Sequence, residues 1–519
     1  MTREAMIGTA TATPGVASRP AIRNAGRVLG VAGLLGVVGQ LLFFDVGLGI
    51  NFPIAITFLL AGGWILRRRR SWPVRHDAWL GPAAIAFAAF AAVRADPTIA
   101  FLDVLTSLAL AGFALASLGG RQVVTLPFSG LIRLAFGAVG WAVTGAAPAV
   151  GAARDQLPSA TALGRRAAPA MPVVRGLVLA VPVVVLFVAL FASADAVFGR
   201  LVEDLFGFEL ELELGDVGWR LLVAASLAWL AAGGLALAAS VPGTSTPDTA
   251  ARVRHNLHPT EITTVLVAVA MVFGIFVALQ AAYLFGGLDT LAAAGMTYAN
   301  YARRGFFELV AVAVLAGGLV IAADRLARQR TRPLVVAAIT VTALTGVVLV
   351  SAALRLRLYQ EAYGWTELQL YVLSTIVLLA VGVGGLVLAV AANRVRWIGH
   401  VLIVAALVIG FGLNVIGPAR FITEQNVARV LDPSLVPPNG STGLDEVYAL
   451  SLGDDAVPSL LRALPALDTP TAAYLETDLA VRLSQLRNES GLNAWQAWNA
   501  GRSAARDALE AARAAGDLP

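Results

Sequence analysis

The sequence contains neither cysteine nor lysine, and only 14% of its 519 residues are charged. Without cysteine, no disulfide framework, thiolate nucleophile or cysteine-ligated metal is possible. All 38 basic residues are arginines, which we attribute to codon usage rather than to chemistry. Soluble domains carry about 25% charged residues, whereas 58% of this chain is hydrophobic. The composition therefore indicates that lipid, not water, is the main solvent.

Long apolar runs fill most of residues 28–416. A membrane-spanning helix needs about 20 mainly apolar residues, because unpaired backbone polar groups are too unfavourable in hydrocarbon. The sequence therefore predicts an all-α fold, a polytopic transmembrane helix bundle of about 11 spans. The predicted spans are residues 28–44, 48–66, 78–93, 98–118, 173–192, 217–239, 261–286, 306–322, 333–354, 371–392 and 398–416.

The two ends of the chain differ in composition from the apolar region between them. Residues 1–27 are rich in Thr, Ala, Pro and Arg and lack a signal-peptide cleavage pattern, which predicts a disordered cytoplasmic tail. Residues 417–519 hold 8 Arg and 13 Asp or Glu, with apolar positions at helical spacing. They predict a small C-terminal extracytoplasmic helical domain. Its expected core includes Leu460, Leu461, Leu483, Trp495 and Trp498.

The positions of the arginines predict the orientation, because cytoplasmic loops retain basic residues. With the N-terminus in the cytoplasm, segments on that side carry 23 arginines and the short outside loops carry 6. We therefore expect a plasma-membrane protein with its C-terminus outside. Residues 134–150 are uncharged, but if they crossed the membrane every later loop would change sides and the arginine bias would reverse. We therefore expect an interfacial or re-entrant segment. The basic residues thus indicate topology and not a nucleic-acid partner.

Polar residues cluster near the entry to the eighth predicted span. Tyr301, Arg304 and Glu308 fall at i, i+3 and i+7 and share one helical face. On the seventh span, Gln280 and Tyr283 can line the same surface. An ionisable residue inside the bilayer is a functional candidate by default, here for an anion or lipid headgroup. The alternative is structural: Arg304 anchors the helix at the headgroups and Glu308 neutralises it.

Two further carboxylates are candidates for a binding or structural role. Asp103 lies early in the fourth span, where an unpaired carboxylate takes up a proton or seeks an arginine such as Arg94. Asp195 belongs to an acidic outside loop. The four histidines lack metal-ligand spacing, so neither a metal nor a cofactor is predicted. The basic run Arg67, Arg68, Arg69 and Arg70 is a topology anchor that is also suited to anionic lipid.

Several phrases of the sequence resemble a known family. They include Phe276–Gly287, Thr297–Leu309, Ala192–Phe198, Gly49–Pro53, Asp454–Leu460 and Trp495–Asn499. Together they resemble the bacterial integral-membrane family called domain of unknown function 4173, which is related to domain of unknown function 4153. The resemblance extends over nearly the whole chain and implies no particular activity.

Three classes of function are compatible with the sequence. We favour a non-enzymatic membrane component whose outward helical domain binds an envelope protein. A transporter of a small solute or lipid is the first alternative, although no paired repeat with broken helices is detectable. The second alternative is a membrane-embedded enzyme acting on a lipid-linked substrate, with Tyr301, Arg304, Glu308 and Asp195 at its outer face.

Overall fold

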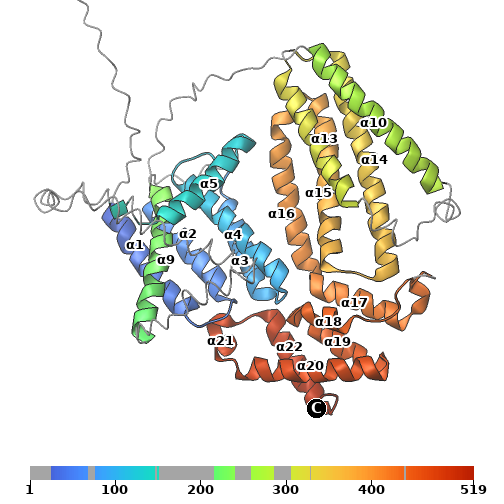
Figure 1. The fold of residues 1–519 in the computed structure, drawn as a ribbon. Helices are drawn as coiled ribbons and strands as arrows, with labels where there is room; N and C mark the ends of the chain where they lie inside the picture. The colour runs from blue at the N-terminus through green and yellow to red at the C-terminus, as the bar shows by residue number, and fades with distance from the viewer. Residues whose placement is uncertain are drawn as a thin grey trace, which may run out of the picture.

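The computed structural model describes residues 25–67, 76–146, 149–150, 216–239, 259–285, 306–327, 329–437 and 440–519. Within these residues every regular element is a helix, which confirms the predicted all-α class. The helices form two apolar bundles and a third group that lies across one end of both (Figure 1).

The first bundle comes from the N-terminal half of the chain. It contains α1 (Ala25–Phe43), α2 (Asn51–Leu66), α3 (Leu80–Val93), α4 (Pro97–Leu118), α5 (Phe128–Thr144) and α9 (Asp216–Ala239). Small residues let these helices approach closely. Gly36 of α1, for example, faces Ala224 and Ala228 of α9 so closely that a Cβ atom would clash with both. Close backbone approach therefore accounts for part of the glycine content of the spans.

The second bundle contains α10 (Pro259–Phe285), α13 (Phe306–Leu326), α14 (Arg332–Tyr363), α15 (Glu367–Ala391) and α16 (Ile398–Ile416). The helix α14 is longer than the predicted span 333–354. Its last two turns are polar and are supported by an i,i+4 ion pair at 3.0 Å between Arg357 and Glu361. The two bundles touch along α16, where Phe411 packs edge-on against Phe90 of α3 with ring centroids 5.3 Å apart.

Eight of the described helices are long and apolar enough to cross a membrane. They are α1, α4, α9, α10, α13, α14, α15 and α16, and each coincides with a predicted span. Three shorter apolar helices, α2, α3 and α5, accompany them. The predicted span 173–192 lies outside the described residues, so eleven spans stay a prediction. Most of residues 134–150 belongs to the single helix α5, which packs on α4 and α9.

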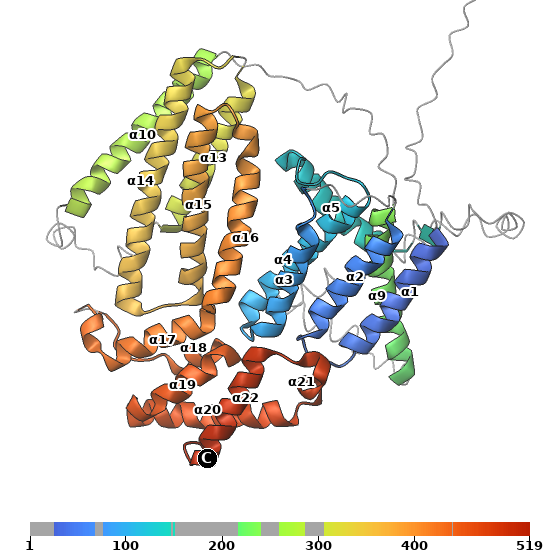
Figure 2. The ribbon, with the colours of Figure 1, turned by 180° about the vertical axis from the view of Figure 1, so that it is seen from behind.

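The C-terminal helices lie across the ends of both bundles in the two opposite views (Figures 1 and 2). They are α17 (Pro418–Leu431), α18 (Glu446–Ser451), α19 (Val457–Ala463), α20 (Thr469–Asn488), α21 (Ser490–Asn493) and α22 (Ala500–Ala515). Leu460, Leu475, Leu479 and Leu483 are fully buried among them. The same core contains Ile99, Leu370 and Leu413 from α4, α15 and α16, so these helices pack directly on the membrane helices.

The prediction that Trp495 and Trp498 belong to this core is wrong. Their exposed fractions are 64% and 49%. The sequence pattern assumed one helix from Trp495 to Leu509, whereas the chain makes a short turn over Trp495–Ala497 and starts α22 at Ala500. The two indoles therefore do not share a helical face with the buried Leu509. Leu460 and Leu483 are buried as predicted, and Leu461 is partly buried against the core.

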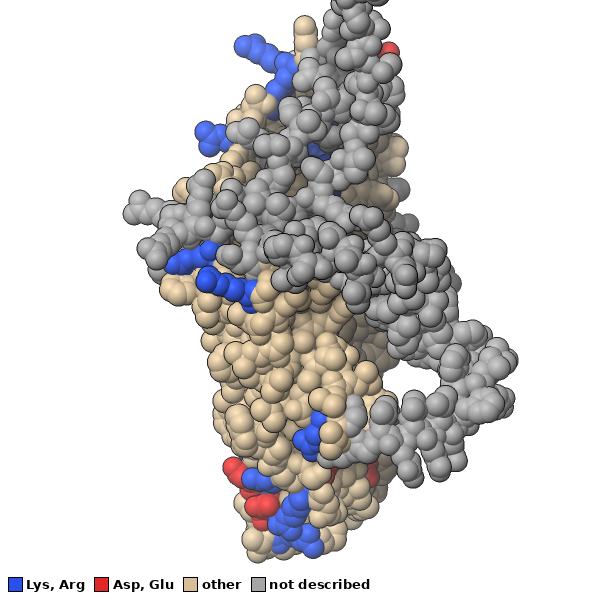
Figure 3. All heavy atoms as spheres, turned by 90° about the vertical axis from the view of Figure 1, so that its left-hand side faces the viewer, with Lys and Arg blue, Asp and Glu red and all other residues tan. Residues whose placement is uncertain are grey.

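Three of the loops that the sequence assigned to the outer side are described, and each meets the C-terminal helices. The α1–α2 loop, the α3–α4 turn and the α14–α15 turn each hydrogen-bond to residues beyond 417. Figure 3 shows a broad zone without coloured charges on one face, between arginines above and the mixed charges of the C-terminal helices below. The chain is thus a multi-pass membrane protein in which the three described loops of the predicted outer side lie together.

Candidate functional site

The sequence-predicted cluster around the eighth span lies mostly outside the described residues. Tyr301, Arg304 and Asp195 belong to undescribed segments. Gln280 and Tyr283 fall in α10, and Glu308 falls in α13, but the placement of their side chains is not among what the structure describes. This cluster therefore stays a prediction. Of the arginine run, only Arg67 is described, and its guanidinium lies 3.9 Å from the centroid of the Trp64 ring.

Asp103 is the predicted site residue whose surroundings the structure describes. It is 2% exposed, and its Oδ1 accepts a hydrogen bond of 2.8 Å from Nδ2 of Asn414 on α16. Arg94, its predicted partner, turns instead to the end of α16, where its Nε donates to the Asn414 carbonyl at 2.8 Å. The guanidinium therefore satisfies a carbonyl at a helix C-terminus, while an amide holds the carboxylate.

Unpaired oxygen atoms gather on the same surface of α4, α15 and α16. Ile99, Leu370 and Leu413 from these helices share one core, and the polar residues flank that core on each helix. Among the described residues the oxygens have no hydrogen-bond partner although they are buried. They are Asp96 Oδ2, Asp103 Oδ2, Glu367 Oε1, Tyr371 Oη and Asn414 Oδ1. Buried acceptors without donors are rare in native proteins and point to bound protons, water or a cation.

The carboxylate of Asp96 is at the edge of this surface, just before the first turn of α4. Its Oδ1 caps that helix by accepting from the backbone N–H groups of Thr98 at 2.9 Å and Ile99 at 3.2 Å. Burial raises the pKa of Asp96 to about 6, and the negative charge of Glu367 acts in the same direction. Asp96 therefore titrates well above the usual range of a carboxyl group.

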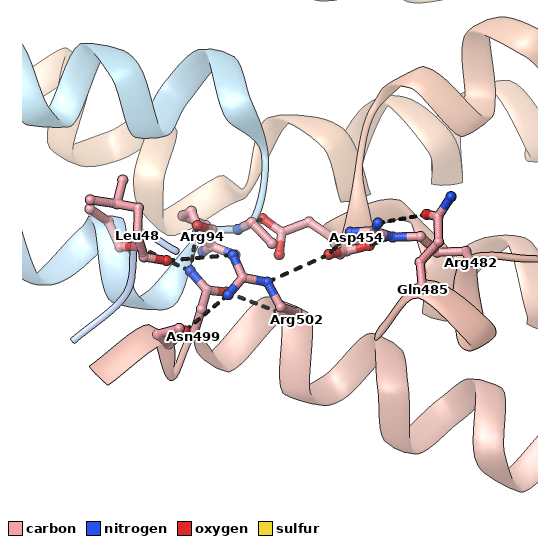
Figure 4. Close-up of polar contacts among 11 residues, drawn as sticks. Leu48, Arg94, Asp454, Arg482, Gln485, Asn499 and Arg502 are labelled. Carbon is pink, nitrogen blue, oxygen red and sulfur yellow. Dashed lines mark hydrogen bonds and ion pairs between the residues drawn. The ribbon is translucent and has the colours of Figure 1, made fainter. Parts of the chain in front are cut away.

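An ion-pair network joins the C-terminal helices close to the same place (Figure 4). Asp454 is 4% exposed and receives two hydrogen bonds from Arg482 on α20, at 2.7 and 2.9 Å. Nε of Arg502 on α22 lies 4.0 Å from Oδ2 of the same carboxylate, and Nη2 of Arg502 donates to the Leu48 carbonyl at 3.4 Å. Hydrogen bonding to Asp454 raises the pKa of Arg482, so the guanidinium keeps its positive charge.

The α3–α4 turn is held by two side chains of the C-terminal helices. Nδ2 of Asn499 donates to the carbonyls of Ala91 at 3.0 Å and Arg94 at 2.8 Å. Oδ2 of Asp455 accepts from the Ala95 N–H at 3.1 Å. Burial raises the pKa of Asp455, and the Ala95 N–H and the charge of Arg94 oppose that shift. The end of α3 and the start of α4 are thus fixed by side chains 360 and 408 residues later in the sequence.

The α14–α15 turn is held in an equivalent way by α17. Arg429 donates to the carbonyls of Gln360 at 3.1 Å, Glu361 at 2.6 Å and Ala362 at 3.2 Å. Asn426 exchanges two hydrogen bonds with the backbone of Trp365, at 2.7 and 2.8 Å. These contacts satisfy carbonyls that every α-helix leaves unpaired at its C-terminus. One C-terminal unit is therefore bonded to a turn in each bundle.

This arrangement offers charge and hydrogen bonding rather than a recognisable catalytic group. Within the described part of the chain, no three His, Cys, Asp or Glu residues are grouped so that they could hold a metal ion. Sequence reasoning found Asp103 but missed Asp96, Asp454, Arg482 and Asn499. The only sequence signal at Asp454 and Asn499 was their place in the family-like phrases, which identify no partner.

One of the comparisons with known proteins identifies a family. A family model described as a domain of unknown function (DUF4153) matches residues 82–463. No curated protein and no solved structure matches the chain. The matched range contains the buried oxygens of α4, α15 and α16 and ends before Arg482 and Asn499. Because the match covers well over half of the sequence, the chain belongs to the family defined as domain of unknown function 4153.

Proposed function

We propose that this protein is a non-enzymatic membrane component whose C-terminal helical domain clamps two helix bundles together and presents its outer surface to an envelope protein. The observation that supports the proposal is the double attachment of that domain. Asn499 and Asp455 bind the α3–α4 turn, while Arg429 and Asn426 bind the α14–α15 turn. Such attachment holds both bundles and the domain in one fixed arrangement.

The helix α20 offers a surface for such a partner. Tyr474 and Val481 lie seven residues apart on one face of α20 and are about half exposed. Their helix runs along the side of the domain away from the bundles, with only the end of α22 beyond it (Figure 1). Aromatic and apolar side chains within a polar rim are typical of protein interfaces. The proposed orientation, with the N-terminus in the cytoplasm and this domain outside, rests on the arginine asymmetry.

Site-specific photo-crosslinking in cells tests the proposal. A photoreactive amino acid replaces Tyr474 or Val481, and a matched variant carries it at Leu388. Leu388 is an apolar residue that is 71% exposed and lies near the end of α15 opposite the domain. We expect a discrete protein adduct from the α20 positions and none from Leu388. Absence of an adduct at both α20 positions, with the full chain present in the membrane, contradicts the proposal.

Transport is the second candidate, because the unpaired oxygens lie where the two bundles meet. Asp103 belongs to the first bundle, and Tyr371 and Asn414 belong to the second. A flux assay tests this reading in proteoliposomes that contain a pH-sensitive dye and carry a cation gradient. A proton or cation flux that Asp103→Asn abolishes supports transport. Equal, background-level flux in wild type and variant excludes transport of these ions.

Two finer assignments also belong to the proposal. The phrases around Phe276–Gly287 and Thr297–Leu309 support a closer relation to domain of unknown function 4173. The run Arg67–Arg70 supports contact with anionic lipid on the cytoplasmic side, because basic residues next to a span attract anionic headgroups.

A further inference from the structure

The exposed indoles of Trp495 and Trp498 need an explanation that the fold of the domain does not supply. Both are about half exposed or more, while Leu475, Leu479 and Leu483 of the same domain are fully buried. Tryptophan is enriched at membrane–water interfaces, where its apolar ring and its polar N–H are accommodated together. The position of the segment in the molecule therefore decides what surrounds these rings.

The tryptophan segment is bonded to the end of α1 and the start of α2. The Ile50 N–H donates to the Trp498 carbonyl at 2.9 Å, and the Gly47 N–H donates to the Gly491 carbonyl at 3.0 Å. Nε2 of Gln496 donates to the carbonyl of Leu41, an exposed apolar residue in the last turn of α1. Trp495 and Trp498 thus lie at the level where two apolar helices end, which is the boundary of the bilayer.

A small pocket of about 110 Å³ opens beside the indoles. Trp495, Trp498, Asn493, Arg502 and Arg506 supply its polar and aromatic lining, and no Asp or Glu lines it. Arg502 and Arg506 are four residues apart on α22 and so face the same side. The pocket has room for a phosphate-sized group but not for a whole lipid.

The charged side chains that line the pocket are all positive. Arg502 and Arg506 line it, and no Asp or Glu does. Arg502 lies 4.0 Å from Asp454, a carboxylate that already pairs with Arg482. Arg506 donates to Oδ1 of Asn493 at 3.2 Å, and no ion pair among the described residues includes it. A phosphodiester carries one negative charge, and guanidinium groups bind its oxygens with short, charge-assisted hydrogen bonds.

We propose that the pocket between Trp495, Trp498 and Arg506 binds the phosphodiester headgroup of an anionic phospholipid from the leaflet next to the C-terminal domain. The indoles lie at headgroup level, the guanidinium of Arg506 donates to the phosphate, and the acyl chains stay in the bilayer beside α1. This contact is independent of the basic run Arg67–Arg70 and of any partner on α20. It fixes the domain to the membrane surface.

Native mass spectrometry of the full-length protein in detergent tests the site. Short-chain phosphatidylglycerol is titrated into wild type, Arg506→Gln and Trp495→Ala, with phosphatidylcholine as the zwitterionic comparison. Arg513→Gln is the matched control, because Arg513 is exposed, lies on α22 and does not line the pocket. We expect Arg506→Gln to weaken the tightest phosphatidylglycerol binding about tenfold, the effect of losing one charge-assisted hydrogen bond. Arg513→Gln should leave that binding unchanged.

Thermal unfolding of each variant in detergent separates a binding defect from a folding defect. Trp495→Phe, which keeps an aromatic ring, should retain more binding than Trp495→Ala at the same unfolding temperature. Equal phosphatidylglycerol binding by wild type and Arg506→Gln overturns the proposal. Displacement of the lipid by millimolar inorganic phosphate also overturns it, because the pocket would then recognise a free anion rather than a headgroup in the bilayer.

Discussion

The side-chain amide of Asn499 donates a 2.8 Å hydrogen bond to the backbone carbonyl of Arg94, a residue 405 positions earlier in the chain. Arg94 ends α3, and Asn499 begins α22, whose backbone it caps by accepting from the Arg502 N–H at 3.0 Å. One buried side chain therefore terminates a membrane helix and starts a helix of the C-terminal domain. This coupling makes the junction a sensitive place for mutation.

Replacement of Asn499 by alanine should lower the free energy of unfolding by about 2–3 kcal/mol, because it removes a helix cap and the donor to two carbonyls. Asn499→Asp should also destabilise the protein, although aspartate caps helices well, since its oxygen would face the carbonyls of Ala91 and Arg94. Thermal unfolding in detergent measures both effects. Asn488→Ala, at an exposed position of α20, is the control. Full stability of Asn499→Asp would show that only the cap matters.

The Asp454–Arg482 pair should behave as a coupled unit. Arg482→Gln leaves a buried carboxylate with only the 4.0 Å contact to Arg502, and breaking a buried pair in this way costs about 3–5 kcal/mol. The double variant with Asp454→Asn should lose less stability than the sum of the two single changes. A double-mutant cycle on the unfolding free energy measures this coupling. Additive losses would show that the pair does not contribute.

Asp96 should make stability depend on pH. Its pKa rises from 3.8 to about 6 in the folded protein, which therefore holds the proton more tightly than the unfolded chain. This stabilisation is complete below about pH 4 and disappears as the pH rises through 6, a loss of about 3 kcal/mol. Asn also caps helices, so Asp96→Asn should flatten the decline of the unfolding temperature between these pH values.

The matched control for this titration is Asp468→Asn. Asp468 also precedes a helix, α20, but it is exposed. Its replacement should leave the pH dependence as in wild type. Burial also raises the pKa of Asp455, so some decline should remain in Asp96→Asn. An Asp96→Asn protein with the same pH profile as wild type would contradict the assignment.

The contact between Asp103 and Asn414 should couple α4 to α16. Each alanine substitution removes one partner of a buried hydrogen bond and leaves the other without it, so each should destabilise the protein. The interaction free energy from the cycle of Asp103→Ala, Asn414→Ala and the double variant should be about 1–2 kcal/mol. Ion flux in the proteoliposome assay can be measured on the same variants as a separate readout. A vanishing interaction term would show that the two residues act independently.

The orientation can be tested directly because the chain has no cysteine. Gln329, in the loop between α13 and α14, and Ser441, in the C-terminal domain, are both exposed. We expect an impermeant thiol reagent added to intact cells to label Ser441→Cys and not Gln329→Cys. Labelling after lysis shows that both thiols are reactive. The reverse pattern in intact cells would invert the orientation.

The surroundings of Asp103 show how much of the candidate site could be predicted from the sequence. Asp103 was recognisable because a carboxylate inside an apolar helix is unfavourable and therefore conspicuous. Its partner was not: Arg94 satisfies the carbonyls at the end of α16, and Asn414 reaches the carboxylate. The Asp103 carboxylate and the carbonyls at the end of α16 are both suitable partners for the Arg94 guanidinium. Only the packing of α3, α4 and α16 decides between them. The prediction that Trp495 is buried was wrong for a related reason, because a local turn separates Trp495 from the helix α22.

The sequence by itself determined the all-α class, the apolar spans and the acidic helical tail, because the bilayer requires long apolar segments whose backbone polar groups are paired internally. Only the tertiary structure decided which helix ends lie against the C-terminal domain. Helical periodicity assigns a face to each helix but no partner, and hydrogen bonds such as Asn499 to Arg94 join residues 405 positions apart. The direction of a side chain, and therefore the site, depends on packing between elements that are distant in the sequence.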